Sequence, residues 1–482
     1  MIAENSSSKL HQINLSSNQR TGIMIALVLG AFVAILNETL LGNALNDLMQ
    51  ELNVEATTVQ WLSTAYMLTV GILVPVTALL QKWFTTRQLF ISAMSIFTVG
   101  TLIAAFSGSF EPLLVGRIVQ AAGTGLILPL LMNTILLIYP PEKRGAAMGI
   151  MGLVIVVAPA IGPTLSGIIV DHLSWEWLFF TMLPFSIISI FVGLKYLINV
   201  TELTKPKVDF LSIIYSTIGF GGIVYGFSSS GSEGWDAPEV YGTIILGVVA
   251  LALLVIRSLR IKNPILDFRV FKFPMFSLTV VLMTVVMMVM FSSMTLLPMF
   301  LQSVLLLTAF TSGLVMLPGS LVNGVLAPIS GKLFDKFGAK VLVIPGLIFV
   351  AVALYLFSGL ELDSTKGEFI TYHIILMIGI ALVMMPVQTF GLNQLSKEYY
   401  GSGSAILNTV QQVAGAIGTA LFISIMSSST ESYIEENVTN PQDPMQLLAG
   451  ALHGFEKTFN VAMIFAIVAI VIAFFMKSKK NK

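Results

Sequence analysis

Apolar runs of about 20 residues recur from one end of the chain to the other, and each is long enough to cross a bilayer as a helix. Of the 482 residues, 56% are hydrophobic and only 10% are charged. A soluble protein carries about 25% charged residues, so this composition lies far outside that class. The runs therefore predict an all-α integral membrane protein.

The apolar runs divide the chain into 14 predicted transmembrane helices. The spans are residues 21–45, 57–80, 88–108, 112–138, 146–170, 178–199, 210–230, 239–257, 277–302, 311–331, 340–359, 370–393, 403–426 and 457–476. The longest connection, residues 427–456, predicts a surface hairpin or a short amphipathic segment on the outer face.

Lys and Arg are concentrated on one side of this predicted topology. With the N-terminus in the cytoplasm, 22 of the 25 Lys and Arg residues face inward, Lys366 and Lys457 face outward, and Arg117 lies in the membrane. Cytoplasmic loops of membrane proteins carry such an excess of positive charge. A missed or invented helix would invert every later loop and remove the bias, so we expect both termini to be cytoplasmic.

Two stretches of the first half are echoed in the second half. The segment after Ala78 corresponds to the one after Gly331, and Gly145 to Gly162 corresponds to Gly401 to Gly418 at the same spacing. Such repeats predict two six-helix bundles with a substrate site near the midplane between them. The expected domains are a disordered cytoplasmic tail (1–20), a first bundle (21–200), two additional helices (201–258), a basic cytoplasmic linker (259–276), a second bundle (277–476) and a basic tail (477–482).

The first predicted span contains a carboxylate, Glu38. An acid at mid-membrane depth costs about 2.5–3.5 kcal/mol on insertion scales, so it indicates a function. Arg117 is the only other ionisable residue that we place so deeply, and the predicted depths of the two overlap. A carboxylate that is both desolvated and beside a guanidinium can gain and lose a proton as water access alternates. The alternative is a structural charge locked to Arg117.

Several classes of chemistry are excluded by what the sequence lacks. There is no cysteine, which rules out disulfides, thiol catalysis and Cys-ligated zinc. There is also no nucleotide-binding loop, no zinc-protease motif and no serine-hydrolase motif. The histidines are scattered without metal-ligand spacing, at His11, His172, His373 and His453. We therefore expect no enzyme activity, no nucleic-acid partner and no cofactor other than the proton as coupling ion.

Motifs along the chain resemble those of the major facilitator superfamily, in its branch of 14-helix drug:proton antiporters, which includes multidrug and lincomycin-resistance exporters. The inner loop from Gly331 to Lys340 matches G-x-L-x-D-[RK]-x-G-x-[RK] in full. The matching segments elsewhere are Arg117-Ile-Val-Gln120, Ala158-Pro159-Ala-Ile-Gly162-Pro163, Ser174-Trp175-Glu176-Trp177, Leu297-Pro298 and Leu317-Pro318-Gly319. The resemblance covers residues 20–476.

The resemblance implies a monomer in the bacterial inner or plasma membrane that exports drugs in exchange for protons. From the buried charges themselves we expect Glu38 and Arg117 to couple the proton, with a structural or orienting role or direct substrate contact as the alternatives for Arg117. The first-span motif usually reads L-D-x-T, whereas this chain has Leu36-Asn37-Glu38-Thr39. The acid has thus moved by one residue, which is about 100° around a helix.

Two groups of residues are candidates for conformational change. Pro159, Gly162 and Pro163 can bend the fifth span into a gate, although ordinary close helix packing is an alternative. The inner-loop motif predicts an interhelical contact between the two halves, and a solvated charge cluster is the alternative. Its residues are Gly331, Asp335, Lys336, Gly338 and Lys340, with Lys332 beside them.

A flexible cavity rich in Met and amide side chains suits varied lipophilic compounds. The candidates for substrate contact are Asn37, Gln120, Asn133, Met294, Gln302, Asn323, Gln388, Asn393, Asn408, Gln411 and Gln412. Helix packing is the alternative role for each of them. No second acid appears on the spans at 277–331, so we expect neutral, zwitterionic or monocationic substrates.

The sequence therefore predicts a proton-coupled secondary transporter that exports lipophilic small molecules by alternating access. A dedicated exporter of an endogenous metabolite or lipid is one alternative. A transporter-like sensor or a lipid scramblase without proton coupling is another, and an intramembrane enzyme is disfavoured because no catalytic set is present.

Overall fold

The computed structural model describes residues 15–54, 56–201, 203–204, 209–262, 264–437 and 443–477. Most of the predicted disordered tail (residues 1–14) and most of the basic tail (residues 478–482) lie outside these ranges. The described residues form 14 α-helices and three short 3₁₀ helices. Among them, 13 helices are long and apolar enough to cross a membrane. The prediction of an all-α membrane protein with 14 helices is confirmed.

The helices follow one another through short connections. They are α1 (Ser17–Glu51), α2 (Ala56–Trp83), α3 (Thr86–Ala105), α4 (Phe110–Ile138), α5 (Arg144–His172), α6 (Trp177–Tyr196), α7 (Phe210–Glu233), α8 (Pro238–Arg260), α9 (Pro274–Ser303), α10 (Ala309–Phe337), α11 (Ala339–Ser358), α12 (Lys366–Asn393), α13 (Tyr400–Asn437) and α14 (Pro444–Phe474). The 3₁₀ helices are η1 (Pro141–Lys143), η2 (Phe268–Lys272) and η3 (Lys397–Tyr399).

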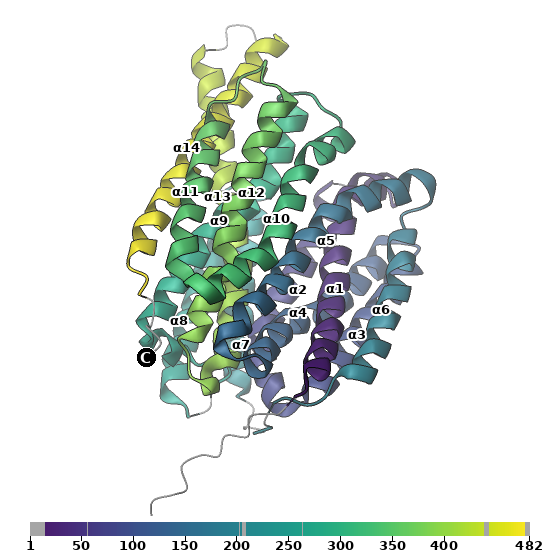
Figure 1. Ribbon diagram of the computed structural model, residues 1–482. Helices are drawn as coiled ribbons and strands as arrows, with labels where there is room; N and C mark the ends of the chain where they lie inside the picture. Colours follow the sequence, from purple (N-terminus) through teal and green to yellow (C-terminus); the bar gives the residue numbers. More distant parts are fainter. Residues whose placement is uncertain are drawn as a thin grey trace, which may run out of the picture.

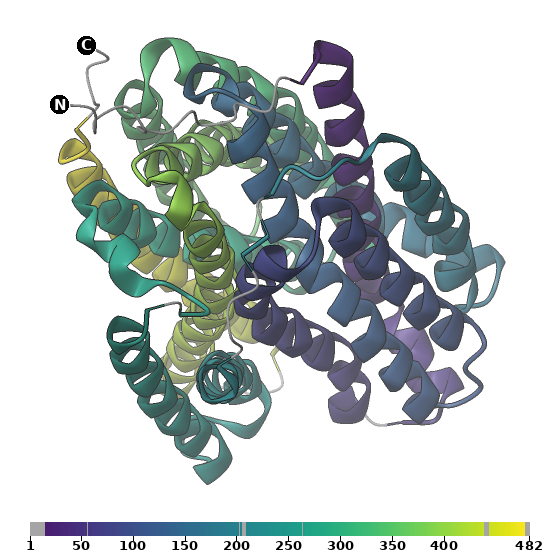
Figure 2. The ribbon, with the colours of Figure 1, turned by 90° about the horizontal axis from the view of Figure 1, so that it is seen from below.

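Helices α1–α6 gather on one side of the molecule and α9–α14 on the other (Figure 1). The two groups meet mainly where α5 packs along α10 and where α2 packs along α13. Helix α7 lies against both α2 and α13, and α8 packs outside it (Figure 2). We call the end where α1 begins and α14 finishes the basic end. The opposite end, where α13 turns back into α14, is the hairpin end.

Local sequence sets several helix boundaries. Thr85 and Thr365 each cap a helix, and Gln88 and Glu368 complete the reciprocal capping box three residues later. Such caps satisfy backbone N–H groups that a helix start leaves unpaired. Between α10 and α11, Gly338 has a φ of 80°, which a side chain rarely tolerates. The glycine of the inner-loop motif therefore has a backbone role here.

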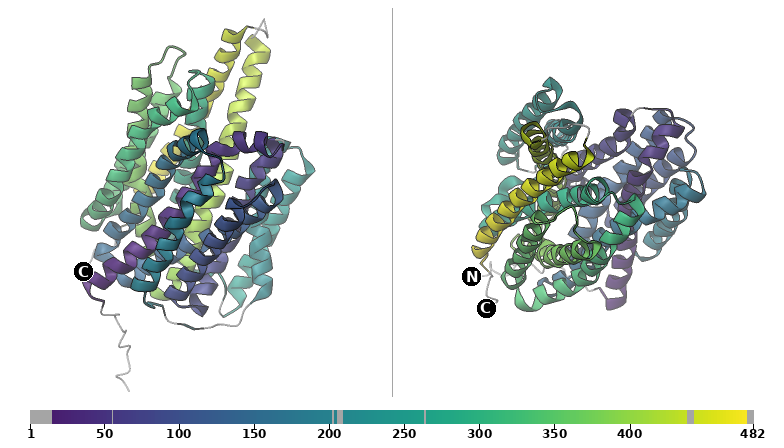
Figure 3. Two further views of the ribbon diagram at one scale, coloured as in Figure 1. Left: turned by 90° about the vertical axis from the view of Figure 1, so that its right-hand side faces the viewer. Right: turned by 90° about the horizontal axis from the view of Figure 1, so that it is seen from above.

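Three predicted helix boundaries are wrong, at the end of α13 and at the starts of α14 and α1, although the hairpin predicted within residues 427–456 is present. Helix α13 continues to Asn437 and α14 begins at Pro444, so most of the predicted outer loop 427–456 is a helical hairpin (Figure 3). No Gly or Pro interrupts residues 427–437, and the two helices pack closely where Gly454 faces Thr430. At the other terminus, α1 already begins at Ser17, inside the predicted disordered tail.

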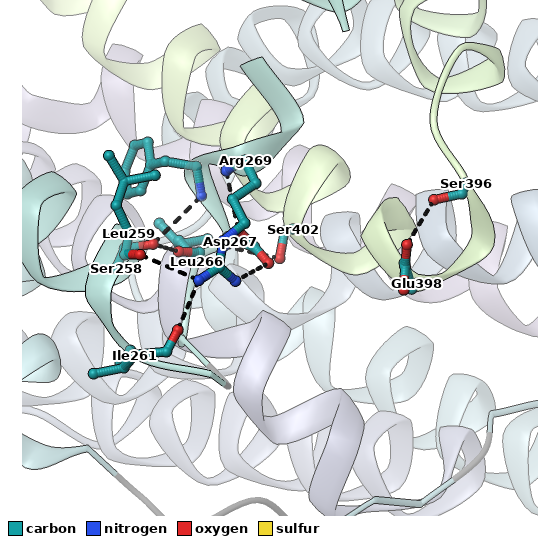
Figure 4. Close-up of polar contacts among 10 residues, drawn as sticks. Ser258, Leu259, Ile261, Leu266, Asp267, Arg269, Ser396, Glu398 and Ser402 are labelled. Atoms are coloured by element: carbon teal, nitrogen blue, oxygen red, sulfur yellow. Dashed lines mark hydrogen bonds and ion pairs between the residues drawn. The ribbon is translucent and has the colours of Figure 1, made fainter. Parts of the chain in front are cut away.

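Polar contacts tie the linker between α8 and α9 to the second bundle (Figure 4). The Ser258 hydroxyl donates to the carbonyl of Leu266 at 2.6 Å. The Arg269 guanidinium donates to the carbonyls of Leu259 and Ile261 at the end of α8. The backbone N–H of Asp267 donates to the Ser402 hydroxyl on α13 at 3.1 Å. The predicted basic linker is therefore hydrogen-bonded to α8 and to α13.

An ion pair joins the start of α7 to α8 at the basic end, and we expect its contribution to stability to depend on pH. Arg257 donates two hydrogen bonds to the Asp209 carboxylate, at 2.8 and 2.9 Å, and Ser212 donates another. These contacts, Arg257 first, lower the pKa of Asp209 from 3.8 to about 2. Because folding lowers this pKa, the stabilisation is present above about pH 4 and is lost as the pH falls towards 2.

We expect Asp209→Asn to lower the melting temperature at pH 7, measured by intrinsic tryptophan fluorescence in detergent. The difference from the wild type should shrink as the pH approaches 2. A difference that stays constant across this range would show that the carboxylate charge does not hold the two helices together.

Candidate functional site

Arg117 lies on α4 inside the first bundle, where it is 1% exposed. Its Nε donates to the carbonyl of Leu62 at 3.4 Å, and Nη1 donates to Oε1 of Gln120 at 3.1 Å. The guanidinium also lies over the ring of Tyr66, 4.1 Å from the ring centre. A carbonyl, an amide and an aromatic face thus surround the buried cation, which makes its burial tolerable.

Gln120 joins this arginine to two further helices. Its Nε2 donates to Oδ1 of Asn37 on α1 at 3.3 Å and to Oγ1 of Thr101 on α3 at 2.9 Å. The Tyr66 hydroxyl on α2 lies 2.7 Å from Oγ1 of Thr124 on α4. Four helices of the first bundle therefore meet in one hydrogen-bonded group. We call this group, with Asn37, Tyr66, Thr101, Arg117 and Gln120 as its members, the polar cluster, and we include Glu38, which lies beside it on α1 without a hydrogen bond to it.

Glu38 is the part of the polar cluster that remains uncommitted. Its side chain is half-buried and lies within electrostatic reach of Arg117. It forms no ion pair or hydrogen bond with any residue that the structure describes. Asn37, one residue before Glu38, is the residue of this motif that contacts Gln120. The predicted ion pair with Arg117 is therefore not present in this conformation.

Tyr66 was missed by the sequence analysis, because nothing in its span distinguishes it from a packing residue. We expect Tyr66→Leu to weaken the polar cluster more than Tyr66→Phe does, since phenylalanine keeps the ring beneath Arg117. A cation–π contact is worth about 0.5–2 kcal/mol. Thermal unfolding and transport should both show this order. Equal effects of the two substitutions would mean that the hydroxyl contact with Thr124 matters and the ring does not.

The inner-loop motif joins the two bundles at the basic end. Oδ1 of Asp335 on α10 accepts from the N–H of Gly145 at 2.8 Å, and Oδ2 accepts from the N–H of Ala146 at 2.9 Å. Both N–H groups belong to the first turn of α5. A carboxylate satisfies the unpaired donors at a helix start and interacts favourably with the helix dipole. Asp335 thus acts as a cap for a helix of the opposite bundle.

Two glycines allow α5 and α10 to approach closely at this point. A Cβ atom added at Gly331 would overlap the carbonyl of Gly145, and one added at Gly145 would overlap the carbonyl of Gly331. The lysines of the motif do not contribute to this contact. Lys340 donates to the carbonyl of Phe474 at the end of α14, and Lys336 lies over the ring of Phe337. In this conformation both contacts lie within the second bundle, and the join between the halves at this motif is made by Asp335 and the two glycines.

Arg144 is a second contact between the bundles that the sequence analysis treated only as a topogenic charge. Its guanidinium donates to the carbonyls of Leu136 and Tyr139 in the first bundle, and to Oδ1 of Asn393 on α12 at 2.8 Å. It also lies over the ring of Tyr400 on α13. The residue is 4% exposed. Arg144 and Asp335 together close the basic end.

Glycine-mediated contacts between α5 and α10 run from the basic end to about the middle of the two helices. Gly149 packs against Ala327 and Pro328, and Gly324 faces Val157. Nearer the hairpin end, a Cβ atom added at Gly167 or Gly313 would have no neighbour within 4 Å. The closest glycine contacts between the two bundles thus lie in the half of α5 and α10 nearer the basic end.

The predicted bending residues of α5 lie beside the polar cluster. A Cβ atom at Gly162 would overlap the Thr39 hydroxyl, so this glycine lets α5 pack against α1 one residue after Glu38. Pro159 is half-buried in the uninterrupted helix α5. Pro163 lies outside the side chains that the structure describes.

The remaining substrate candidates do not gather in one place. Asn133 donates to Gln81, Asn323 to the sulfur of Met377, and Asn408 to the sulfur of Met132 across the bundle interface. Gln388 is fully buried, whereas Gln411 and Gln412 are half-buried. Met294 is 40% exposed, and Gln302 is exposed at the last turn of α9. Only Asn37 and Gln120 belong to the polar cluster.

Known proteins resemble this chain over nearly its full length. The model of the Major Facilitator Superfamily matches residues 27–419. The lincomycin resistance protein LmrB of Bacillus subtilis (strain 168) is 54% identical over 460 residues, which is 95% of this chain and 96% of that protein.

More distant proteins extend this similarity. The multidrug export protein EmrB of Haemophilus influenzae is 28% identical over 429 residues, covering 88% of this chain and 84% of that protein. The crystal structure of the human organic anion transporter MFSD10 superposes with a TM-score of 0.68 at 14% identity, covering 95% of this chain and all of that one. The latter likeness is one of fold.

Proposed function

Because this chain belongs to the major facilitator superfamily and is homologous to efflux transporters, we propose that it exports lipophilic drugs from the cytoplasm in exchange for protons. The observation that carries the proposal is Glu38, a half-buried acid inside the membrane without an ion-pair or hydrogen-bond partner among the described residues. An ionisable side chain at this depth is expensive and marks ion or substrate pathways. The basic end is the cytoplasmic end in this proposal.

The polar cluster provides what a proton carrier needs. Arg117 is held by Leu62, Gln120 and the ring of Tyr66, so it stays in place whether Glu38 is charged or neutral. The fixed guanidinium favours the carboxylate form, and the apolar surroundings favour the protonated form. Glu38 takes up a proton from the outer side and releases it when a substrate reaches the cluster from the cytoplasm.

Alternating access follows from the way in which the bundles meet. The contacts of Asp335 and Arg144 hold the basic end closed in this conformation. Breaking them opens the cytoplasmic side, and rocking of the two bundles then closes the hairpin end. The glycine contact between α5 and α10 is the surface that must separate and re-form in each cycle.

Substrate charge is limited by the number of acids. Glu38 is the single carboxylate of the polar cluster, and α9 carries no acidic residue at all. One carboxylate cannot readily neutralise a dication and exchange a proton as well. The substrates we propose are therefore neutral, zwitterionic or monocationic. We also propose that the transporter works as a monomer.

The test is efflux from bacterial cells that express the chain and lack their own exporters. The name of the relative from Bacillus subtilis makes lincomycin the first compound to try. We expect resistance to lincomycin together with active export of several unrelated lipophilic dyes, each competing with the others. Export of one compound alone, without competition, would indicate a dedicated exporter. Export that persists after collapse of the proton gradient would contradict proton coupling.

A further inference from the structure

His373 is a buried ionisable residue that the proposed cycle does not use. It lies in α12, inside the second bundle, and its side chain is fully buried. The sequence analysis counted it among scattered histidines, and the statement that Arg117 is the only other deeply placed ionisable residue is wrong for this reason. An ionisable side chain within a transmembrane helix indicates a function by default.

The internal repeat relates His373 to Arg117. The starts of α4, η1 and α5 (residues 110, 141 and 144) are matched, at one constant interval, by the starts of α12, η3 and α13 (residues 366, 397 and 400). The same interval carries Arg117 onto His373. Each of the two residues therefore lies at the same depth of the corresponding helix in its bundle.

The surroundings of the two residues differ in one respect. Helix α2 offers the ring of Tyr66 to Arg117, whereas α10, which corresponds to α2, offers Gly319 to His373. A Cβ atom at Gly319 would overlap Nδ1 of His373. The glycine of the Leu317-Pro318-Gly319 segment thus leaves room for the imidazole against the backbone of α10.

Neither ring nitrogen of His373 makes a well-formed hydrogen bond among the described residues, and the backbone of Met316 on α10 is the polar group that lies close enough to interact with the ring. A buried polar group without a partner costs about 1–3 kcal/mol, and such groups are rare in native proteins. A charged imidazolium at this place would cost far more, because no acidic side chain among the described residues pairs with it. In the conformation seen here the imidazole is therefore uncharged, and its burial costs free energy. A conformation in which water reaches the ring removes that cost.

The helices packed against α12 bring no charge to this depth. Helices α9 and α11 have no acidic residue, and the charged residues of α10 lie in its last two turns. The remaining ionisable groups on the helices that contact α12 lie at the ends of those helices or on the outer surface, namely Lys340, Tyr355, Lys366, Glu368, Tyr372, Arg144, Asp171, His172, Tyr400, Glu431, Tyr433, Glu435 and Glu436. Water is thus the available proton source for His373.

We propose that His373 is a second proton-exchanging group, and that its protonation state changes with the conformation of the second bundle. When α10 and α12 shift apart, water reaches the ring and a proton from it binds the free nitrogen. When the contact with Gly319 re-forms, the proton returns to water before the ring is buried. This inference rests on the proposed transport cycle. Because His373 lies away from the polar cluster, its proton follows the conformational change and does not compete with substrate.

The conformational equilibrium of Glu38→Gln protein tests this proposal, because that substitution removes the other titrating group. The chain has no cysteine, so Ile168→Cys on α5 and Leu314→Cys on α10 would give a single spin-label pair. Both native side chains are exposed near the hairpin end, and the distance between the labels reports its opening.

We expect the ratio of open to closed forms in Glu38→Gln to change by up to about tenfold per pH unit between about pH 5 and 8. In Glu38→Gln with His373→Gln, the ratio should stay constant within about twofold. The matched control, Glu38→Gln with His453→Gln, changes a histidine on the outer hairpin and should behave as Glu38→Gln alone. Equal pH dependence with and without His373, or none in either protein, would overturn the proposal.

A second measurement needs no substitution at His373 and so remains decisive if His373→Gln does not fold. The chain has only four histidines, and the signals of isotope-labelled imidazoles can be assigned with His11→Gln, His172→Gln and His453→Gln. We expect the His373 ring to change protonation state when saturating substrate is added near pH 6. A ring that stays uncharged from pH 5 to 8, with and without substrate, would overturn the proposal while leaving the role of Glu38 intact.

Discussion

Replacing Glu38 with glutamine is expected to abolish the uphill accumulation of substrate in inverted membrane vesicles. A pH gradient of one unit stores about 1.36 kcal/mol per proton, which sustains about a tenfold substrate ratio for each proton exchanged. Glutamine keeps the shape of the side chain but cannot carry a proton, so the ratio should fall to about one. Downhill exchange of labelled for unlabelled substrate should continue, because it needs no net proton movement.

Asn37→Asp with Glu38→Gln is the matched variant, since it returns the acid to the position that the family motif favours. Asn37 already accepts from Gln120, so an aspartate there would face the arginine side of the polar cluster. Recovery of accumulation would show that the cluster, and not one side-chain direction, is what couples the proton. Full accumulation by Glu38→Gln alone would remove this acid from the mechanism.

Gly331→Val is expected to stop transport by preventing closure of the basic end. Any Cβ atom at this position overlaps the backbone of Gly145, and a backbone atom cannot rotate away. Overpacking of this kind costs about 1–3 kcal/mol, which is about 5- to 150-fold in the ratio of the two conformations. The protein should still fold, because the strain exists only in the closed form.

The control for this prediction is Gly313→Val on the same helix, where an added Cβ atom has no neighbour within 4 Å. It should retain transport near the wild-type level. Distances between spin labels at the basic end would show Gly331→Val shifted towards the open form. A closed basic end in Gly331→Val, with normal transport, would contradict the role assigned to this glycine contact.

The helices themselves could be predicted because a membrane limits the possibilities. Runs of apolar residues, the bias of Lys and Arg, and caps such as Thr85 and Thr365 are all local properties of the sequence. The extension of α13 to Asn437 was missed because residues 427–437 are polar, and they are helical through packing against α14. Hydropathy cannot detect a helix that continues beyond the bilayer.

The site was predictable in part. A charge inside a membrane span is conspicuous, so Glu38 and Arg117 stood out, and Gln120 followed from its spacing of one helical turn. Tyr66 and Arg144 were missed because their roles come from partners on other helices, which spacing along one helix cannot reveal. Whether Glu38 forms an ion pair with Arg117 also depends on how α1 is rotated, and only the packed structure fixes that rotation.

Proton release from purified protein on addition of substrate tests the central claim most directly. The claim is that one carboxylate in the first bundle is shared between proton and cargo. Weakly buffered detergent solution near neutral pH, with a pH indicator, gives the number of protons released per bound substrate. The account predicts that Glu38→Gln releases about one proton fewer per bound substrate than the wild type does. The same number from both proteins, with substrate still bound, would contradict it.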